Sequence, residues 1–139
     1  MLVLVDTPIR SLALRRSSAD LNPREQRLTA ALRELIRGGR AQLVGPVRQE
    51  LLSGLRREAA FRKLRDQLRS FDEPPLEVDD YEEAARIQNH CRARGIVGSA
   101  IDFLLCAAAS RRDWRIFTTD HDFTRYATVL PLNLLPITS

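Results

Sequence analysis

Two acidic residues of this 139-residue chain lie where short apolar segments end. Asp6 follows the run Leu-Val-Leu-Val at residues 2–5, and Asp120 follows the run at residues 115–119. In an open parallel sheet, ligands bind beyond the carboxyl ends of the strands, so acids on different strands can share one site. Carboxylates held close together repel one another and usually need a divalent cation. The sequence therefore predicts a metal site at one edge of a sheet.

Asp102 is the third candidate, because it interrupts an apolar run from Ile101 to Ala109 that predicts a buried helix. An aspartate is rarely buried unless it is paired or binds a metal. The structural alternative is a capping box, in which Ser99 caps the helix and Asp102 returns the hydrogen bond. That motif normally uses Glu or Gln, since Asp is short for the reach, so a functional interpretation is favoured.

Glu50 is the fourth candidate and lies one turn into a helix expected to open at Gly45-Pro46. A helical glutamate is usually structural and paired with a base three or four residues away. At Glu50 none of those positions holds a base, so this acid lacks a local partner. The alternative is a favourable interaction between its charge and the start of the helix.

Helix capping is also the structural alternative for Asp6 and Asp120. Thr7 or Thr119 is able to cap in their place, which would free the acids for other work. Only one of Asp120 and Asp122 can cap the helix that follows them. Asp120 is nearer the strand end and is the better ligand, while Asp122 is a plausible secondary ligand.

The charge balance agrees with a polyanionic substrate. The chain has 22 Lys and Arg against 18 Asp and Glu, and Lys63 is the only lysine. Without the four candidate acids, 22 bases face 14 acids and the remainder carries +8. An acidic pocket in a basic body suits a polyanion that is attracted to the surface and cut at a metal. A compositional bias toward arginine is the alternative, and it explains the preference for Arg over Lys but not the basic excess.

Strand-like and helix-like segments alternate, which predicts an α/β fold with a parallel sheet. Strands are expected at residues 2–5, 41–44, 115–118 and, at one edge, 132–135. Helices are expected from Thr7-Pro8, over 23–37 after an Asn22 cap, from Gly45-Pro46, and over 59–70, 80–94, 99–110 and 121–127, with a polar loop at 17–21. No repeat or linker divides the chain, so we expect one domain over residues 1–139.

Several other classes of protein do not fit the sequence. No apolar run approaches the roughly 20 residues of a membrane helix, and the N-terminus does not resemble a signal peptide, so a cytoplasmic location is expected.

Cys106 lies in an apolar run and is expected to be buried. His90 and His121 have no partners typical of a catalytic triad and are expected at the surface.

Two enzyme classes that also have acidic residues at strand ends lack required residues in this sequence. A phospho-receiver domain needs a lysine after a late strand, but Lys63 lies in a mid-chain helix. A haloacid-dehalogenase-type phosphatase needs a second Asp two residues after the first, where this chain has Pro8. A non-catalytic basic module of α/β fold that binds RNA or a partner remains as the alternative, although it has no need of four converging acids.

Four segments, in this order and spacing, resemble the PIN-domain nucleases and, within them, the VapC-like toxins of bacterial toxin–antitoxin pairs. The segments are residues 3–7 (VLVDT), 47–56 (VRQELLSGLR), 101–108 (IDFLLCAA) and 117–123 (FTTDHDF). The resemblance implies a three-layer sandwich with a central, mostly parallel sheet, Mg²⁺ or Mn²⁺ as cofactor, cleavage of RNA, a homodimer and a cognate antitoxin. Carried over by position, the acidic quartet is Asp6, Glu50, Asp102 and Asp120.

The resemblance also implies a mechanism and a partner surface. A metal held by Asp6, Asp102 and Asp120 would activate a water, while Glu50 would bind a second metal or orient that water. Apolar residues of the 46–71 region are expected to line a groove or dimer face that receives the antitoxin. Arg10 departs from the family, which often has a large apolar or aromatic residue there.

Overall fold

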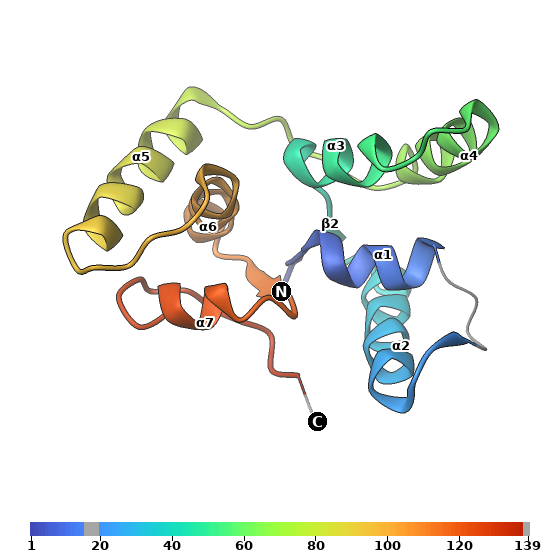
Figure 1. Cartoon of the computed structure of the whole chain (residues 1–139), viewed down its shortest axis with the longest axis horizontal. Helices are drawn as coiled ribbons and strands as arrows, with labels where there is room; N and C mark the ends of the chain where they lie inside the picture. Colours follow the sequence, from blue (N-terminus) through green and yellow to red (C-terminus); the bar gives the residue numbers. More distant parts are fainter. Residues whose placement is uncertain (16–19, 138–139) are drawn as a thin grey trace.

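The first strand of the chain lies at the centre of the sheet. The computed structural model describes residues 1–15 and 20–137. Its elements are β1 (Val3–Val5), α1 (Thr7–Arg15), α2 (Pro23–Arg37), β2 (Ala41–Gln42), α3 (Gly45–Ser53), α4 (Glu58–Leu68), α5 (Val78–Arg92), α6 (Ala100–Arg112), β3 (Arg115–Phe117) and α7 (Asp122–Tyr126). The described strands are all parallel, in the order β2-β1-β3 (Figure 1). All three therefore end at the same edge of the sheet.

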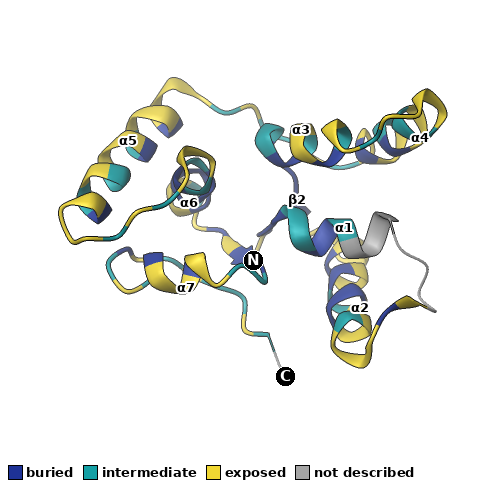
Figure 2. Ribbon diagram, in the orientation of Figure 1, coloured by how far each residue is buried: buried dark blue, intermediate teal, exposed yellow. Residues whose placement is uncertain are grey.

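Helices cover both faces of this sheet. Successive residues of a strand point to opposite faces, and β1 follows this rule. Val3 and Val5 belong to a core cluster with apolar residues of α1 and α2, whereas Leu4 belongs to a second cluster built from α3 to α7. Figure 2 shows that the buried residues of the helices face the strands and the exposed residues face outward. The predicted three-layer α/β fold with a parallel sheet is confirmed.

Local sequence signals account for α2. The Asn22 side chain accepts a hydrogen bond from the Glu25 amide at 2.8 Å, and the Glu25 side chain accepts one from the Asn22 amide at 3.1 Å. This reciprocal capping box fixes the start of the helix, with Pro23 in its first turn. The helix ends before Gly38, and Gly39 adopts a φ of +66°. The predicted range of 23–37 is confirmed.

Other predicted boundaries need correction. Thr7 is the first helical residue of α1 and not its cap. Helix α5 begins at Val78 and not at Asp80, because the Asp80 carboxylate accepts a hydrogen bond from the Glu77 amide at 2.8 Å and so closes the turn that starts there. The predicted edge strand at 132–135 is a single parallel bridge from Leu134 to Ile116. Most of the loop predicted at 17–21 lies outside the described residues.

The predictions for cysteine and histidine have mixed outcomes. Cys106 and Cys91 are both free and buried, as expected for Cys106. His121 is exposed, as expected. His90 is only partly exposed, with its Nε2 atom 3.1 Å from the carbonyl oxygen of Val129, so the prediction of a plain surface residue was wrong there. Among the described residues, no helix is both long and apolar enough to cross a membrane.

Arg10, where the resemblance implies a large apolar or aromatic residue, is buried. Its side chain is fully buried, and Nη2 donates to the carbonyl of Gln42 at 2.7 Å while Nε donates to that of Val5 at 3.3 Å. The guanidinium carbon lies 4.6 Å from the centre of the Phe71 ring. Burial lowers the pKa of Arg10 to about 10. Arg10 thus joins α1 to the carboxyl ends of β1 and β2 by hydrogen bonds.

A buried ion cluster joins α5 to α6. The Asp80 carboxylate is fully buried and accepts hydrogen bonds from Arg111 at 2.6 Å and from both Nη atoms of Arg112 at 2.7 and 2.9 Å. The hydrogen bonds from Arg112 and Arg111 hold the pKa of Asp80 well below its usual value. The cluster therefore fixes the C-terminal end of α6 against the start of α5, and α6 carries Asp102 near its other end.

We predict that Asp80→Asn lowers the free energy of unfolding by about 3 kcal/mol at neutral pH, because two guanidinium groups then lose their carboxylate. Urea denaturation would measure the change. Asp79→Asn is the control, since Asp79 is exposed and lies 3.6 Å from Arg111. The lowered pKa means that the Asp80 contribution is present above pH 3.8 and is lost as the pH falls below it. Equal stability of the two variants would contradict a structural role for the cluster.

Candidate metal centre

Three carboxylates meet near the carboxyl edge of the sheet. Ligand oxygens of Asp102, Asp120 and Asp122 lie within 4.8 Å of one another. Asp102 is the third residue of α6, Asp120 follows β3 after two threonines, and Asp122 begins α7. A donor set made only of carboxylate oxygens suits hard cations such as Mg²⁺ and Mn²⁺. The residues present therefore fit the cation that the sequence resemblance implies.

Asp6 is connected to this group through a threonine. Asp6 is buried at the end of β1, and its two carboxylate oxygens accept hydrogen bonds from the Thr7 amide and the Thr118 hydroxyl, both at 2.8 Å. The Thr118 hydroxyl oxygen in turn accepts a hydrogen bond from the Asp120 amide at 3.0 Å. Thr118 thus bridges the two acids that follow the central strand and its neighbour.

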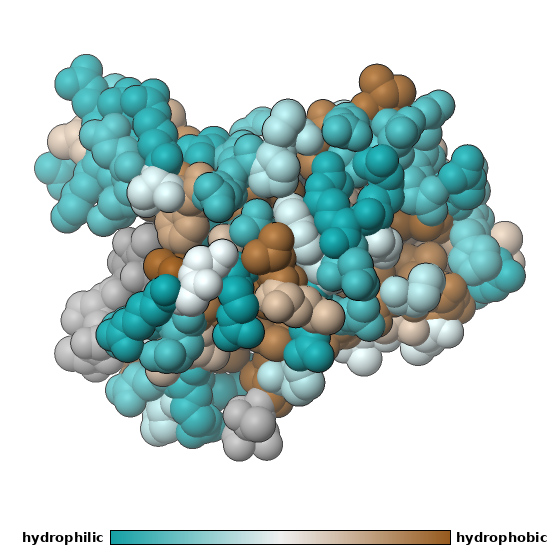
Figure 3. All heavy atoms as spheres, turned by 180° about the vertical axis from the view of Figure 1, so that it is seen from behind, coloured by the Kyte–Doolittle hydropathy of each residue, from teal (hydrophilic) through white to brown (hydrophobic). Residues whose placement is uncertain are grey.

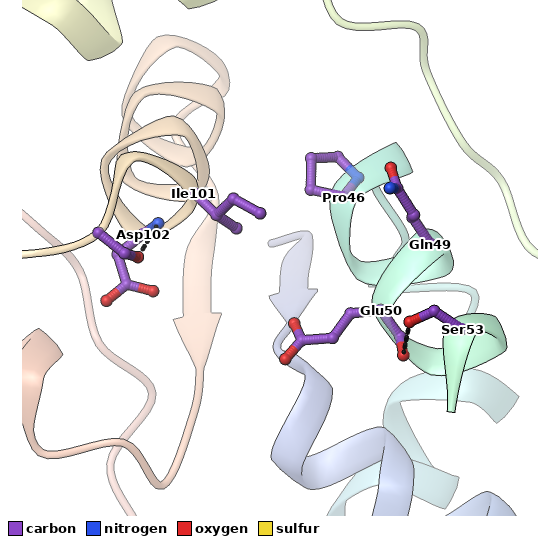
Figure 4. A pocket seen from close by; sticks show the side chains of 7 residues that line it. Pro46, Gln49, Glu50, Ser53, Ile101 and Asp102 are labelled. Carbon is purple, nitrogen blue, oxygen red and sulfur yellow. Dashed lines mark hydrogen bonds between the residues drawn. The ribbon is translucent and has the colours of Figure 1, made fainter. Parts of the chain in front are cut away.

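Glu50 approaches from a different element, α3. Its side chain is exposed, and Oε2 accepts a hydrogen bond from the Thr7 hydroxyl at 2.9 Å. A cavity of about 420 Å³ lies between α3 and α6, lined by Pro46, Gln49, Glu50, Ser53, Ser99, Ile101 and Asp102. Figure 4 shows Glu50 and Asp102 on opposite sides of this cavity. The cavity therefore gives a ligand access to acids from both walls.

The four candidate acids are not equivalent in the structure. Asp102 and Asp120 belong to the group of three, together with Asp122, whereas Asp6 and Glu50 lie outside it. Asp6 nonetheless interacts electrostatically with two of the other acids, since the charges of Asp102 and Glu50 help to raise its pKa. The sequence interpretation of Asp122 as a secondary ligand fits its position, although its side chain also lies 3.7 Å from Arg125.

Burial shifts the pKa values of two of these acids. Desolvation raises the pKa of Asp6, and the hydrogen bonds from Thr118 and Thr7 oppose this effect in part. Desolvation also raises the pKa of Asp102, opposed by hydrogen bonds from Tyr126 and Ser99. In the metal-free protein the ionised forms of both carboxyl groups are therefore disfavoured.

In the part of the chain that the structure describes, the four candidate acids lack basic partners. Among the described residues, no ion pair within 4.0 Å involves Asp6, Glu50, Asp102 or Asp120. This holds in a chain with 22 Lys and Arg. Arginine would be the ordinary way to stabilise a half-buried carboxylate, so its absence there leaves the site open to a cation from solution.

The capping alternatives are partly realised. The Ser99 hydroxyl oxygen accepts a hydrogen bond from the Asp102 amide at 3.0 Å, as a cap should. The Asp102 carboxylate does not complete a capping box and instead accepts a hydrogen bond from the Tyr126 hydroxyl at 2.7 Å. Asp120 accepts a hydrogen bond from the Asp122 amide at 2.9 Å. Because a carboxylate can accept about four hydrogen bonds, Asp102 and Asp120 each keep lone pairs that are available to a metal ion.

The sequence alone assigned no role to the hydroxyl groups of Thr118 and Tyr126, and it assigned Thr7 a capping role instead of the hydrogen bond to Glu50 that the structure shows. Thr7 follows Asp6 directly and Thr118 lies two residues before Asp120, so their positions in the sequence are a weak indication that they contact the acids. Tyr126 had no such signal, because its contact with Asp102 depends on how α7 packs against α6.

We predict that Asp102→Asn stabilises the metal-free protein at about pH 8. Two charges about 4 Å apart repel by up to about 4 kcal/mol at an effective dielectric near 20, and the substitution removes one charge. Because the raised pKa lets the wild type take up protons as the pH falls, this advantage should shrink as the pH is lowered. Mg²⁺ should raise the melting temperature of the wild type, and the variant should lose most of this rise.

Thermal melts in EDTA and in Mg²⁺ would test this, with Asp72→Asn as the control because Asp72 is an exposed acid outside the cluster. If Asp102→Asn melts lower in EDTA and retains the full Mg²⁺ response, Asp102 is a structural residue.

Comparison with known proteins places the chain in a family. The family model described as PIN domain matches residues 18–129. Similar solved structures include VapBC2 from Rickettsia felis bound to a promoter DNA fragment, with a TM-score of 0.76, 16% identity and coverage of 97% of this chain and 98% of that one.

Two further structures are similar over nearly the whole chain. FitAcB from Neisseria gonorrhoeae has a TM-score of 0.74 and 22% identity, and the match covers 96% of this chain and 97% of that one. A toxin–antitoxin complex from Klebsiella pneumoniae has a TM-score of 0.69 and 17% identity, and the match covers 95% of this chain and 99% of that one. No curated protein sequence matches the chain. At these identities the structural likeness concerns the fold, and the family model covers most of the sequence, so the chain belongs to the PIN domain family.

Proposed function

We propose that this protein is a metal-dependent endoribonuclease that hydrolyses RNA phosphodiester bonds and acts as the toxin of a toxin–antitoxin pair in the cytoplasm. The observation that supports the proposal most is the group of three carboxylates at Asp102, Asp120 and Asp122, of which Asp102 lines a cavity of about 420 Å³. Such a group favours a divalent cation, and a cation at a cavity suits phosphodiester hydrolysis. Membership of the PIN domain family agrees with nuclease activity.

We propose the following roles for the acids from their positions in the structure and from the resemblance to PIN-domain nucleases. Asp6, Asp102 and Asp120 would hold Mg²⁺ or Mn²⁺, with Asp122 within reach of the same ion. When bound, the ion would polarise the scissile phosphate and lower the pKa of a bound water. Glu50, on the other wall of the cavity, would accept a hydrogen bond from the attacking water and so orient it, or would hold a second ion.

The surface charge supports an RNA substrate. Outside the four acids the chain carries an excess of eight positive charges, and those that lie at the surface attract a polyanion from solution. Figure 3 shows that hydrophilic side chains dominate the face opposite to the view of Figure 1, with hydrophobic side chains in separate groups. Contacts between arginine and phosphate position an RNA but carry little sequence information.

A cognate antitoxin and a second copy of the chain are the proposed protein partners. One similar structure is a toxin–antitoxin complex, which supports the first. Of the apolar residues in α3 and α4, Val47, Leu51, Leu64 and Leu68 are buried in the core. Leu52 in α3, Leu55 between the two helices and Phe61 in α4 are only partly buried, so part of each side chain is accessible to a partner. We propose that the antitoxin packs there and that one of its basic side chains enters the acidic cavity.

The first functional prediction concerns RNA cleavage. The purified protein should cut RNA with Mg²⁺ or Mn²⁺ and stop when EDTA is added, because the carboxylates act through the ion. Gel electrophoresis of a labelled RNA would measure this. Asp6→Asn, purified in parallel, excludes a contaminating nuclease and should lose most of the activity. Cleavage that continues in EDTA would rule out the metal mechanism, and RNA binding without cleavage in either metal would favour a non-catalytic RNA-binding module.

The second functional prediction concerns the antitoxin. Co-expression should inhibit cleavage, and Phe61→Ser should weaken antitoxin binding about tenfold, or about 1.4 kcal/mol, without changing cleavage by the free protein. Lys63→Ser on the same helix is the control, since Lys63 is exposed and charged. Titration of cleavage with antitoxin would measure the affinity. Unchanged activity in the presence of a co-expressed antitoxin would defeat the proposed pairing.

A further inference from the structure

Tyr126, at the end of α7, makes an unusual contact with the candidate metal centre. Its side chain is fully buried, with its ring centre 5.0 Å from that of Phe103 and 5.4 Å from that of Phe123. A buried tyrosine hydroxyl needs a hydrogen-bond partner. The Tyr126 hydroxyl finds this partner in Oδ2 of Asp102, at 2.7 Å. The aromatic contacts therefore fix the ring, and the ring fixes the position of the donor.

Gly98 makes room for this arrangement. A Cβ atom at residue 98 would lie 2.7 Å from ring carbons of Tyr126 and would also overlap its hydroxyl oxygen. Real Cβ atoms essentially never come that close to another atom, so any other residue would displace the ring. The preceding residue is held on α7 as well, since Arg125 donates to the Val97 carbonyl at 2.8 Å. The segment before α6 and the end of α7 are thus fitted to each other around the hydroxyl group.

The hydrogen bond acts on a side chain that otherwise has rotational freedom. The terminal torsion of an aspartate is broad, so its carboxylate does not hold one orientation by itself. A partner that binds one carboxylate oxygen fixes the orientation of the other, and such outer contacts commonly set the affinity of a metal site. Asp102 has no basic partner within 4.0 Å among the described residues, so its carboxylate depends on neutral donors, of which the Tyr126 hydroxyl at 2.7 Å comes from a different helix.

We propose that Tyr126 is a positioning residue that orients the Asp102 carboxylate toward a divalent cation shared with Asp120 and Asp122, and that Gly98 allows it to do so. The inference rests on the proposed function only in assuming that a divalent cation binds to this group. It does not depend on the identity of the substrate.

The test is the affinity of the free protein for Mn²⁺, without RNA. Tyr126→Phe keeps the ring and its packing but removes the hydroxyl, and we expect it to weaken Mn²⁺ binding about 10- to 100-fold. Electron paramagnetic resonance of unbound Mn²⁺ would measure the affinity at a temperature where both proteins are folded. Tyr81→Phe is the matched control, because Tyr81 is the other tyrosine of the chain and is 55% exposed.

A double-mutant cycle separates positioning from general support of the fold. If Tyr126 acts through Asp102, Tyr126→Phe should cause no further loss of Mn²⁺ affinity in an Asp102→Asn background. Gly98→Ala provides a second route to the same result, since it displaces the phenol without removing it, and it should also weaken Mn²⁺ binding.

Three outcomes would overturn the inference. These are wild-type affinity in Tyr126→Phe, an equal loss in the Asp102→Asn background, and a wild type that binds no Mn²⁺. A wild type that binds Mn²⁺ with the expected dependence on Tyr126 but cleaves no RNA would reject the nuclease proposal and leave this inference standing.

Discussion

The repulsion among carboxylates at one edge of a small parallel sheet is the constraint around which this molecule is organised. Asp6 and Asp102 are partly or fully withdrawn from water, and neither has an arginine or lysine beside it in the described part of the chain. Hydroxyl groups compensate instead, since three of the four candidate acids accept a hydrogen bond from a threonine or a tyrosine. A neutral donor orients a carboxylate without cancelling its charge. The site therefore keeps the negative potential that a cation requires.

The scaffold uses arginine in the opposite way, to cancel charge and satisfy carbonyl groups inside the protein. Arg10 binds carbonyls at two strand ends, and Arg112 with its neighbour neutralises the buried Asp80. Arg48 pairs with Glu73 at 2.6 Å. Part of the arginine content is thus committed to the fold and is not available to RNA. The basic excess of the sequence overstates the charge that faces a substrate.

The sequence was sufficient for features that local pattern determines. The strand ends that carry Asp6 and Asp120, the helix cap at Asn22 and the alternation of strands and helices all follow from short segments. Features that depend on packing between distant segments were not predictable in this way. The donors to the acids, the buried place of Arg10 and the reduction of residues 132–135 to a single bridge all depend on tertiary contacts.

The pairing of β1 with β3 has a consequence for when the protein becomes active. The hydrogen bond between Asp6 and Thr118 joins residues 112 positions apart, and β1 cannot pair with β3 before residues 115–117 have left the ribosome. Contacts between such distant segments form late and slowly, and domains fold as units during synthesis. An unfinished chain therefore carries some of the acids but no assembled site. On the proposed function, a ribosome that makes this protein is exposed to its nuclease only after the segment that carries β3 and Thr118 has been made.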